Sequence, residues 1–247
     1  MVKLSAKCLV AGDSTVGKST LIQLFRSDGS HFPKNYSMSP REPTTIFQCI
    51  AFDGSPNTSS VTWYKCQGSC LPSVHSFKVL HMDRTTRPAS RIWRPFFAQT
   101  TTMDVITKTV QIPDTGDSVE LFLCDSPGKA MFHEMTELLW DQPGALCLVF
   151  DVTCETSFSN CTRWLQRVKS KTTSPYLPGV LVGNKTDLTG RRVVEKIQAE
   201  EWAASHGLVY FETSAKELEN FDQPFRALAK SFHRLYQERV EGIKSLL

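Results

Sequence analysis

The chain is organised around one short stretch, Gly12-Asp13-Ser14-Thr15-Val16-Gly17-Lys18-Ser19. The alternating apolar residues 4–11 before it predict a strand, and residues 20–25 after it predict a helix. A strand, a glycine-rich loop ending in Lys-Ser and a helix, in this order, are typical of a phosphate-binding loop. The glycines let backbone N–H groups point at phosphate oxygens, and the helix N-terminus adds partial positive charge. We therefore predict a phosphate site, the alternative being a glycine turn that binds nothing.

The residues of this loop have expected roles in the phosphate site. Lys18 would neutralise the β- and γ-phosphates of a nucleotide, and the Ser19 hydroxyl would bind Mg²⁺. The predicted nucleotide-binding residues of the loop are Gly12, Asp13, Ser14, Thr15, Val16, Gly17, Lys18, Ser19 and Thr20.

Composition indicates a globular chain from a reducing compartment. The 247 residues are 40% hydrophobic, which suits one or two domains with a sizeable core. Several of the eight cysteines lie inside apolar runs and no signal peptide pattern precedes them, so we expect no disulfide framework. No apolar run approaches the roughly 20 residues that span a bilayer, and the last cysteine is Cys161, so we expect no direct membrane anchor. A net charge of +3 is too small to indicate a nucleic-acid partner.

Beyond residue 103 the chain alternates between predicted strands and helices. Residues 104–112 and 119–124 predict a hairpin, further strands are predicted at 145–150, 179–182 and 208–212, and helices at 156–170, 193–205 and from 222 onward. Ile197 and Trp202 are expected on one side of the helix at 193–205. The last helix should present one apolar face made of Phe225, Leu228, Phe232, Leu235 and Tyr236. This order predicts an α/β fold, with a mostly parallel six-stranded sheet, helices on both faces and one antiparallel edge hairpin.

Three more loops, each after a predicted strand, carry groups suited to a guanine nucleotide. Asp125-Ser126-Pro127-Gly128 offers a carboxylate for Mg²⁺ through water and an N–H for the γ-phosphate. In Asn184-Lys185-Thr186-Asp187, the last carboxylate can accept hydrogen bonds from guanine N1–H and N2, and adenine offers neither donor. Sites of this kind reject the wrong base by roughly 10⁴-fold. Thr213-Ser214-Ala215-Lys216 can place an N–H on guanine O6 and brace Asp187. The nucleotide-binding residues predicted from these loops are Gly128, Asn184, Lys185, Asp187, Ser214, Ala215 and Lys216.

As a set, the four motifs resemble those of the Ras-superfamily small GTPases, over all of the chain except residues 40–99. Within that superfamily the chain is similar to the Rab-like GTPases of ciliary intraflagellar transport, most visibly at residues 25–29, 34–36, 113–122 and 177–188. The resemblance implies a P-loop NTPase small G domain that binds GTP, GDP and Mg²⁺. It further implies a β-sandwich partner, intraflagellar transport protein 25, other subunits of the transport B complex, and a location in the cilium and cytoplasm.

Two residues near the Asp-x-x-Gly glycine depart from the family pattern. Lys129 stands where active members usually carry the glutamine that orients the attacking water. Pro127 stands where alanine is usual and removes an N–H donor. Both changes predict very weak hydrolysis, and we assign no catalytic residue. Two alternatives keep a competent GTPase switch in vesicle or ciliary trafficking: a partner supplies the glutamine, or His133 or Glu134 positions the water. The loop 184–187 disfavours a P-loop kinase or ATPase.

Residues 40–99 do not fit the family pattern. They are rich in Ser, Thr and Pro and show no sustained periodicity, so we expect a G domain of residues 1–39 and 100–247 with an irregular insertion in the first switch region. The insertion has three possible interpretations: a binding module, a zinc site or retained intronic sequence. The candidate zinc ligands are Cys66, Cys70, His75 and His81. We favour the intronic reading because a pyrimidine tract ending in CAG could encode Phe96-Phe97-Ala98-Gln99.

The first switch of the family supplies a threonine hydroxyl to Mg²⁺. Alignment on Met103-Asp104 assigns this role to Thr101, immediately after the insertion. The predicted metal ligands are therefore Ser19, Thr101 and Asp125.

Overall fold

The computed structural model describes residues 2–30, 100, 103–129, 132, 137–174 and 176–245. All of them belong to one compact unit, residues 1–36 with 98–247. The predicted insertion at 40–99, its candidate zinc ligands, Thr101, His133 and Glu134 lie outside the described residues.

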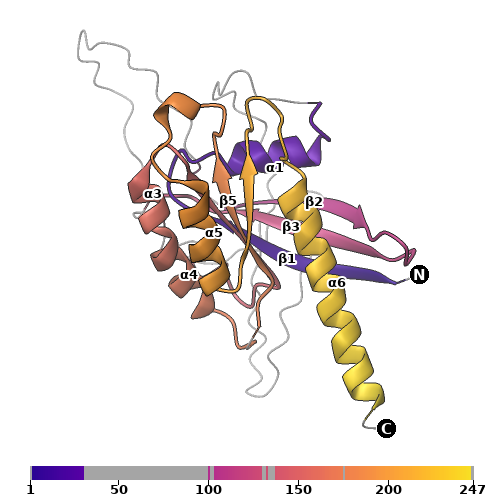
Figure 1. Cartoon of the computed structure of the whole chain (residues 1–247). Coiled ribbons are helices and arrows are strands. Elements are labelled where there is room, and N and C mark those ends of the chain that lie inside the picture. Colours follow the sequence, from indigo (N-terminus) through magenta and orange to yellow (C-terminus); the bar gives the residue numbers. More distant parts are fainter. Residues whose placement is uncertain are drawn as a thin grey trace, which may run out of the picture. The chain divides into compact units, whose positions relative to one another are not determined.

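Six strands form one sheet in the order β2-β3-β1-β4-β5-β6 (Figure 1). Their bounds are Lys3–Ala11 for β1, Asp104–Gln111 for β2, Ser118–Asp125 for β3, Ala145–Asp151 for β4, Gly179–Asn184 for β5 and Val209–Thr213 for β6. The edge strand β2 pairs antiparallel with β3, and every other pairing is parallel. The predicted mostly parallel sheet with its antiparallel edge hairpin is therefore confirmed.

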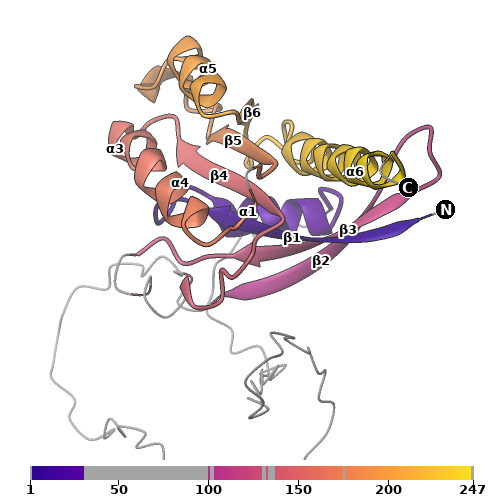
Figure 2. The ribbon, with the colours of Figure 1, turned by 90° about the horizontal axis from the view of Figure 1, so that it is seen from below.

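Helices cover both faces of this sheet (Figure 2). One face carries α1 (Lys18–Arg26) and α6 (Gln223–Lys244), and the other carries α3 (Glu155–Ser159), α4 (Cys161–Lys169) and α5 (Lys196–Ser205). A short 3-10 turn, η2, spans Thr189–Arg191. Within the described ranges, no helix has both the length and the apolar character needed to cross a bilayer.

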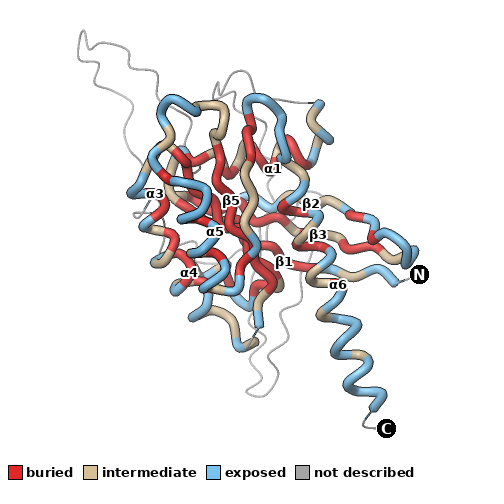
Figure 3. The backbone as a smooth tube through the Cα atoms, in the orientation of Figure 1, coloured by how far each residue is buried: buried red, intermediate tan, exposed pale blue. Residues whose placement is uncertain are grey.

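The core has two parts, one on each face of the sheet. Phe25 of α1 stacks on Phe225 of α6 with ring centroids 4.6 Å apart, while Phe158 and Trp164 pack into the opposite part. Every residue of β4 is buried, because helices cover both sides of this central strand (Figure 3). The carboxyl ends of β1, β3, β5 and β6 lead into the loops that the sequence singles out, as expected for a parallel sheet.

Some predicted helix details are wrong. The segment 156–170 forms two helices, α3 and α4, that meet at Asn160. Helix α5 begins at Lys196, three residues late, since the N–H groups of Val193 and Val194 both donate to Val152 O. Ile197 is 67% exposed, because five residues along a helix correspond to a rotation of about 140°, which separates it from Trp202.

The apolar face of α6 is shorter than predicted. Phe225 and Leu228 are buried and Phe232 packs against the core, but Tyr236 is 38% exposed. The C-terminal half of α6 extends past the sheet (Figure 1), so its side chains have little to pack against.

Candidate nucleotide-binding site

The loop between β1 and α1 has the geometry expected of a phosphate cradle. Gly12 and Gly17 adopt φ values of 141° and 103°, which L-residues rarely reach. A Cβ would lie 2.1 Å from Val149 O at Gly12 and 2.2 Å from Asn184 Nδ2 at Gly17. The predicted glycines are thus required by backbone conformation and by close packing. The remaining predicted residues occupy the loop or the first turn of α1: Asp13, Ser14, Thr15, Val16, Ser19 and Thr20.

Lys18 is buried at the start of α1. Its Nζ donates to Gly12 O at 2.8 Å and Asp13 O at 2.7 Å. Burial lowers the pKa of Lys18 to about 8. The two hydrogen bonds hold the ammonium group inside the loop, where it could donate to phosphate oxygens.

Three oxygen-bearing side chains meet beside this loop. Ser19 Oγ donates to Asp125 Oδ2 and lies 3.0 Å from Thr100 Oγ1. Asp125 Oδ1 is buried and has no hydrogen-bond partner among the described residues. Burial raises the pKa of Asp125 to about 6. A partly unsatisfied buried carboxylate beside two hydroxyls fits Mg²⁺, a hard cation that is bound by oxygen ligands.

Thr100, which lies 3.0 Å from Ser19, is a candidate metal ligand that the sequence analysis did not name. The run Thr100-Thr101-Thr102 offers three hydroxyls, and an alignment shifted by one residue would have assigned the role to Thr100 instead of Thr101. Thr101 lies outside the described residues and stays a prediction. No group of three or more His, Cys, Asp or Glu side chains in the described part of the chain could hold a metal. A Mg²⁺ site with one carboxylate, hydroxyls and phosphate does not require such a group.

Asn184, at the end of β5, joins three loops. Its Nδ2 donates to Val16 O of the phosphate loop at 2.8 Å. Its Oδ1 accepts hydrogen bonds from Thr213 Oγ1 at 3.1 Å and Ala215 N at 3.3 Å. The side chain is buried, so these bonds are shielded from water. The loops predicted to bind phosphate and base are thus held together by one amide.

Asp187 is braced in the way the sequence predicts. Ser214 Oγ donates to Asp187 Oδ1 at 2.8 Å, and Lys216 Nζ lies 3.7 Å from Oδ2. The Asp187 side chain is only 7% exposed, whereas that of Lys216 is 67% exposed. A fixed carboxylate at this edge of the sheet could accept two parallel hydrogen bonds from guanine.

Lys185 has a partner that sequence reasoning missed. Its Nζ lies 2.6 Å from Asp151 Oδ2 at the end of β4, and its φ of 71° is left-handed. Asp151 Oδ1 also accepts from Thr153 N at 2.9 Å and Thr153 Oγ1 at 2.7 Å. Burial raises the pKa of Asp151, but hydrogen bonds from Lys185 and Thr153 outweigh it and hold that pKa below its usual value.

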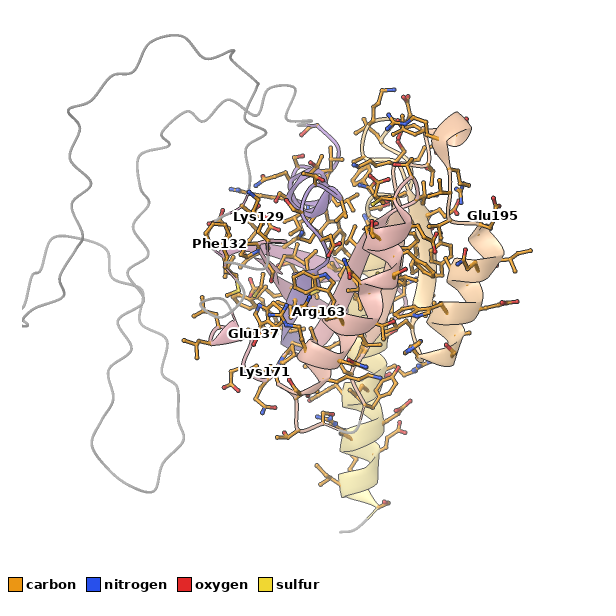
Figure 4. All side chains as sticks on the ribbon, turned by 90° about the vertical axis from the view of Figure 1, so that its left-hand side faces the viewer. Lys129, Phe132, Glu137, Arg163, Lys171 and Glu195 are labelled. Carbon is orange, nitrogen blue, oxygen red and sulfur yellow. The ribbon has the colours of Figure 1, made fainter. Side chains whose placement is uncertain are left out.

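The Asp-x-x-Gly loop packs directly on the phosphate loop. A Cβ at Gly128 would lie 2.2 Å from Ser14 N and 2.3 Å from the carbonyl carbon of Asp13. Lys129 is exposed, and its carbonyl accepts from Phe132 N at 3.1 Å. Figure 4 shows Lys129 and Phe132 close together at the edge of the molecule.

Comparisons with known proteins agree with this geometry. The Ras family model matches residues 88–234, which include the loops at 125, 184 and 213 but not the phosphate loop. The chain is 45% identical over 247 residues to the intraflagellar transport protein 27 homolog of Bos taurus, with 100% of both covered. It is 30% identical over 245 residues to intraflagellar transport protein 27 of Chlamydomonas reinhardtii, covering 98% of this chain and 90% of that protein.

A Rab protein matches about half of the chain. Ras-related protein Rab-30 of Homo sapiens is 38% identical over 127 residues, covering 51% of this chain and 61% of that protein. The Ras-type G domain implies that the chain binds a guanine nucleotide. The chain therefore belongs to the Ras family, as a Rab-like relative of the intraflagellar transport protein 27 homologues.

Proposed function

We propose that this chain binds GTP and GDP with Mg²⁺ as a Rab-like subunit of the intraflagellar transport B complex. It acts in ciliary cargo transport and has very weak intrinsic GTP hydrolysis. The observation that carries the nucleotide part is the Asn184 side chain, which holds the phosphate loop at Val16 against the predicted guanine loop at Ala215. A base bound at Asp187 and phosphates bound at Lys18 would then belong to one ligand.

The metal would be held by Ser19, Asp125 and a first-switch threonine, either Thr101 from the sequence or Thr100 from its position 3.0 Å from Ser19. Mg²⁺ would supply positive charge to the β- and γ-phosphate oxygens. Lys18 would donate to the same oxygens, and Gly128 N–H would reach the γ-phosphate.

The transport role is supported by the relatives that carry the name intraflagellar transport protein 27. By this likeness we expect the chain in the cilium and cytoplasm, bound to intraflagellar transport protein 25 and other B-complex subunits. Co-purification of the full chain from ciliated cells tests this assignment. Recovery without any B-complex subunit would contradict it.

The nucleotide assignment has its own test. Titration of the full chain with fluorescent GTP, GDP and ATP should give much tighter binding of the two guanine nucleotides. Equal affinity for GTP and ATP would contradict the role of Asp187. The two tests are independent. If the chain binds GTP but is not found in the B complex, only the proposed transport role is contradicted.

Lys129→Gln should raise single-turnover GTP hydrolysis. Ras, with its glutamine, hydrolyses GTP unaided at only about 10⁻⁴ s⁻¹, so the wild-type chain should be slower and keep GTP for hours. A glutamine amide can accept from water and donate to phosphate, whereas a lysine ammonium can only donate. The measurement is the first-order decay of bound GTP in full-length protein and in a variant lacking residues 40–99.

Lys129→Ala is the matched control, because it removes the lysine without supplying an amide. Faster hydrolysis in the glutamine variant alone would identify water orientation as the limiting factor. Wild-type turnover as fast as that of Ras would instead favour the competent GTPase switch, with water positioned by another group such as His133 or Glu134.

A further inference from the structure

The phosphate loop contains a carboxylate that is hydrogen-bonded to α4 and to the residue that precedes it. Asp13 Oδ2 accepts a hydrogen bond from Asn160 Nδ2 at 2.7 Å, and Asp13 Oδ1 accepts one from Trp164 Nε1 at 2.8 Å. Asn160 lies between α3 and α4, and Trp164 lies one turn into α4. We call these three side chains the Asp13 anchor. Hydrogen bonds to an ionised group are stronger than neutral ones, so this is a firm attachment.

Electrostatics alone would disfavour a carboxylate at this position. A negative charge beside a phosphate-binding loop repels the negatively charged ligand. The two donors, from α4 and from the residue that precedes it, satisfy the Asp13 oxygens. A residue that works against ligand charge yet is held by two long-range bonds indicates a role in loop position.

The main chain of Asp13 lies inside the nucleotide site. Asp13 O accepts from Lys18 Nζ at 2.7 Å, and the peptide between Asp13 and Ser14 packs against Gly128. Moving Asp13 would therefore displace the lysine, the loop N–H groups and the contact with the Asp-x-x-Gly loop together. The anchor is the attachment that holds this peptide against α4.

Trp164 is itself held firmly by its neighbours. Its ring packs on Trp140 with centroids 5.9 Å apart, and the Arg167 guanidinium lies 5.3 Å from the Trp164 ring centroid. Arg167 is paired in turn with Glu137. Glu137 lies beside α4, on the side of the molecule that also carries Arg163 (Figure 4). The indole donor therefore has little freedom to follow the loop if the loop moves.

We propose that Asp13 is a positioning residue whose bonds to Asn160 and Trp164 hold the phosphate loop in its nucleotide-binding conformation and slow nucleotide release. The proposal rests on the proposed guanine-nucleotide binding. It predicts that weakening the anchor increases the dissociation rate of bound GDP, and that this increase is not explained by a loss of fold stability.

The sharpest test compares two tryptophans that pack against each other. Trp164→Phe removes the indole donor to Asp13 and keeps an aromatic ring. Trp140→Phe makes the same chemical change at a buried indole whose Nε1 has no hydrogen-bond partner among the described residues. With fluorescent GDP loaded on the full chain in Mg²⁺ and chased by unlabelled GDP, we expect dissociation about tenfold faster for Trp164→Phe. We expect a change of about twofold or less for Trp140→Phe.

Asp13→Asn separates positioning from electrostatics by the sign of its effect. Removing the negative charge should tighten GDP binding if charge alone matters. If position matters, the new amide places a donor against Asn160 or Trp164, and GDP should leave faster. The double variant Asp13→Asn, Trp164→Phe should lose less than the sum of the two single effects, because both act through one bond.

The outcomes are distinct. Equal dissociation rates for the two tryptophan variants, or tighter GDP binding by Asp13→Asn, would overturn the anchor. A purely structural role would lower the melting temperatures of both tryptophan variants and leave GDP dissociation unchanged, which also overturns it. If the wild-type chain binds no guanine nucleotide, the proposed function fails instead.

Discussion

Asp187→Asn should lower the affinity for GTP and GDP by about 10⁴-fold, the size of effect expected when a polar site loses its hydrogen-bond match to one base. The carboxylate is braced by Ser214 at 2.8 Å and nearly buried, so it cannot turn away from the base. The substituted amide would present its N–H₂ to the guanine N1–H and N2 donors, or leave one of them unpaired. Equilibrium titration with fluorescent GDP measures the loss directly.

Two controls make this loss specific. Asp222→Asn applies the same change to a partly exposed carboxylate paired with Arg226 at the start of α6, and it should leave GDP affinity unchanged. Xanthosine diphosphate carries a carbonyl oxygen where guanine carries its N2 amine, so it should bind the Asp187→Asn variant better than GDP does. Undiminished GDP affinity in the Asp187→Asn variant would refute the assignment of this residue to the base.

Lys18→Ala should lower nucleotide affinity by at least about 10²-fold, since each hydrogen bond to a charged group is worth about 1.5–3 kcal/mol. The substitution removes the buried ammonium group of the loop, and it leaves Gly12 O and Asp13 O without their donor. Ser19→Asn should weaken Mg²⁺ and nucleotide binding for the corresponding reason, because Ser19 contacts Asp125. Calorimetric titration of each variant with GDP in Mg²⁺ gives its nucleotide affinity.

Lys7→Ala is a closely matched control for this lysine. Lys7 is partly buried, and its Nζ, like that of Lys18, donates to two carbonyls, Leu139 O at 2.7 Å and Asp141 O at 2.8 Å, but away from the phosphate loop. We expect it to lower the melting temperature and to leave GDP affinity unchanged.

Nucleotide at 100 times its Kd should stabilise the wild type by about 2.7 kcal/mol. A nucleotide-free form of equal thermal stability would count against coupling between binding and folding.

The sequence was most informative where residues close together in the chain act together. The phosphate loop and the edge hairpin follow from local spacing and alternation, and the structure places them as predicted. The brace at Asp187 joins residues 27 positions apart, and it was predicted because both loops follow predicted strands. Helix faces were less predictable where apolar residues were sparse. Ile197 was assigned to the same side of α5 as Trp202, but it is exposed, and the small residues Ala199 and Ala203 form the buried side.

Long-range partners could not be predicted from the sequence. Asp13 is 151 residues from Trp164 and 147 from Asn160, and neither donor lies in a recognisable motif. The Asp151 partner of Lys185 was missed for the same reason. Thr100 was missed because three consecutive threonines leave the register undetermined next to residues 40–99. The insertion itself and the domain boundaries drawn around it stay predictions.

The Asn184 amide has a consequence for the kinetics of nucleotide exchange. Through its bonds to Val16, Thr213 and Ala215, one side chain connects the loop proposed to bind the base with the loop proposed to bind the phosphates. A factor that pulls on either half would strain the same three bonds, so it need not touch the base in order to loosen it. Release should then follow a single exponential, with base and phosphates freed in one event.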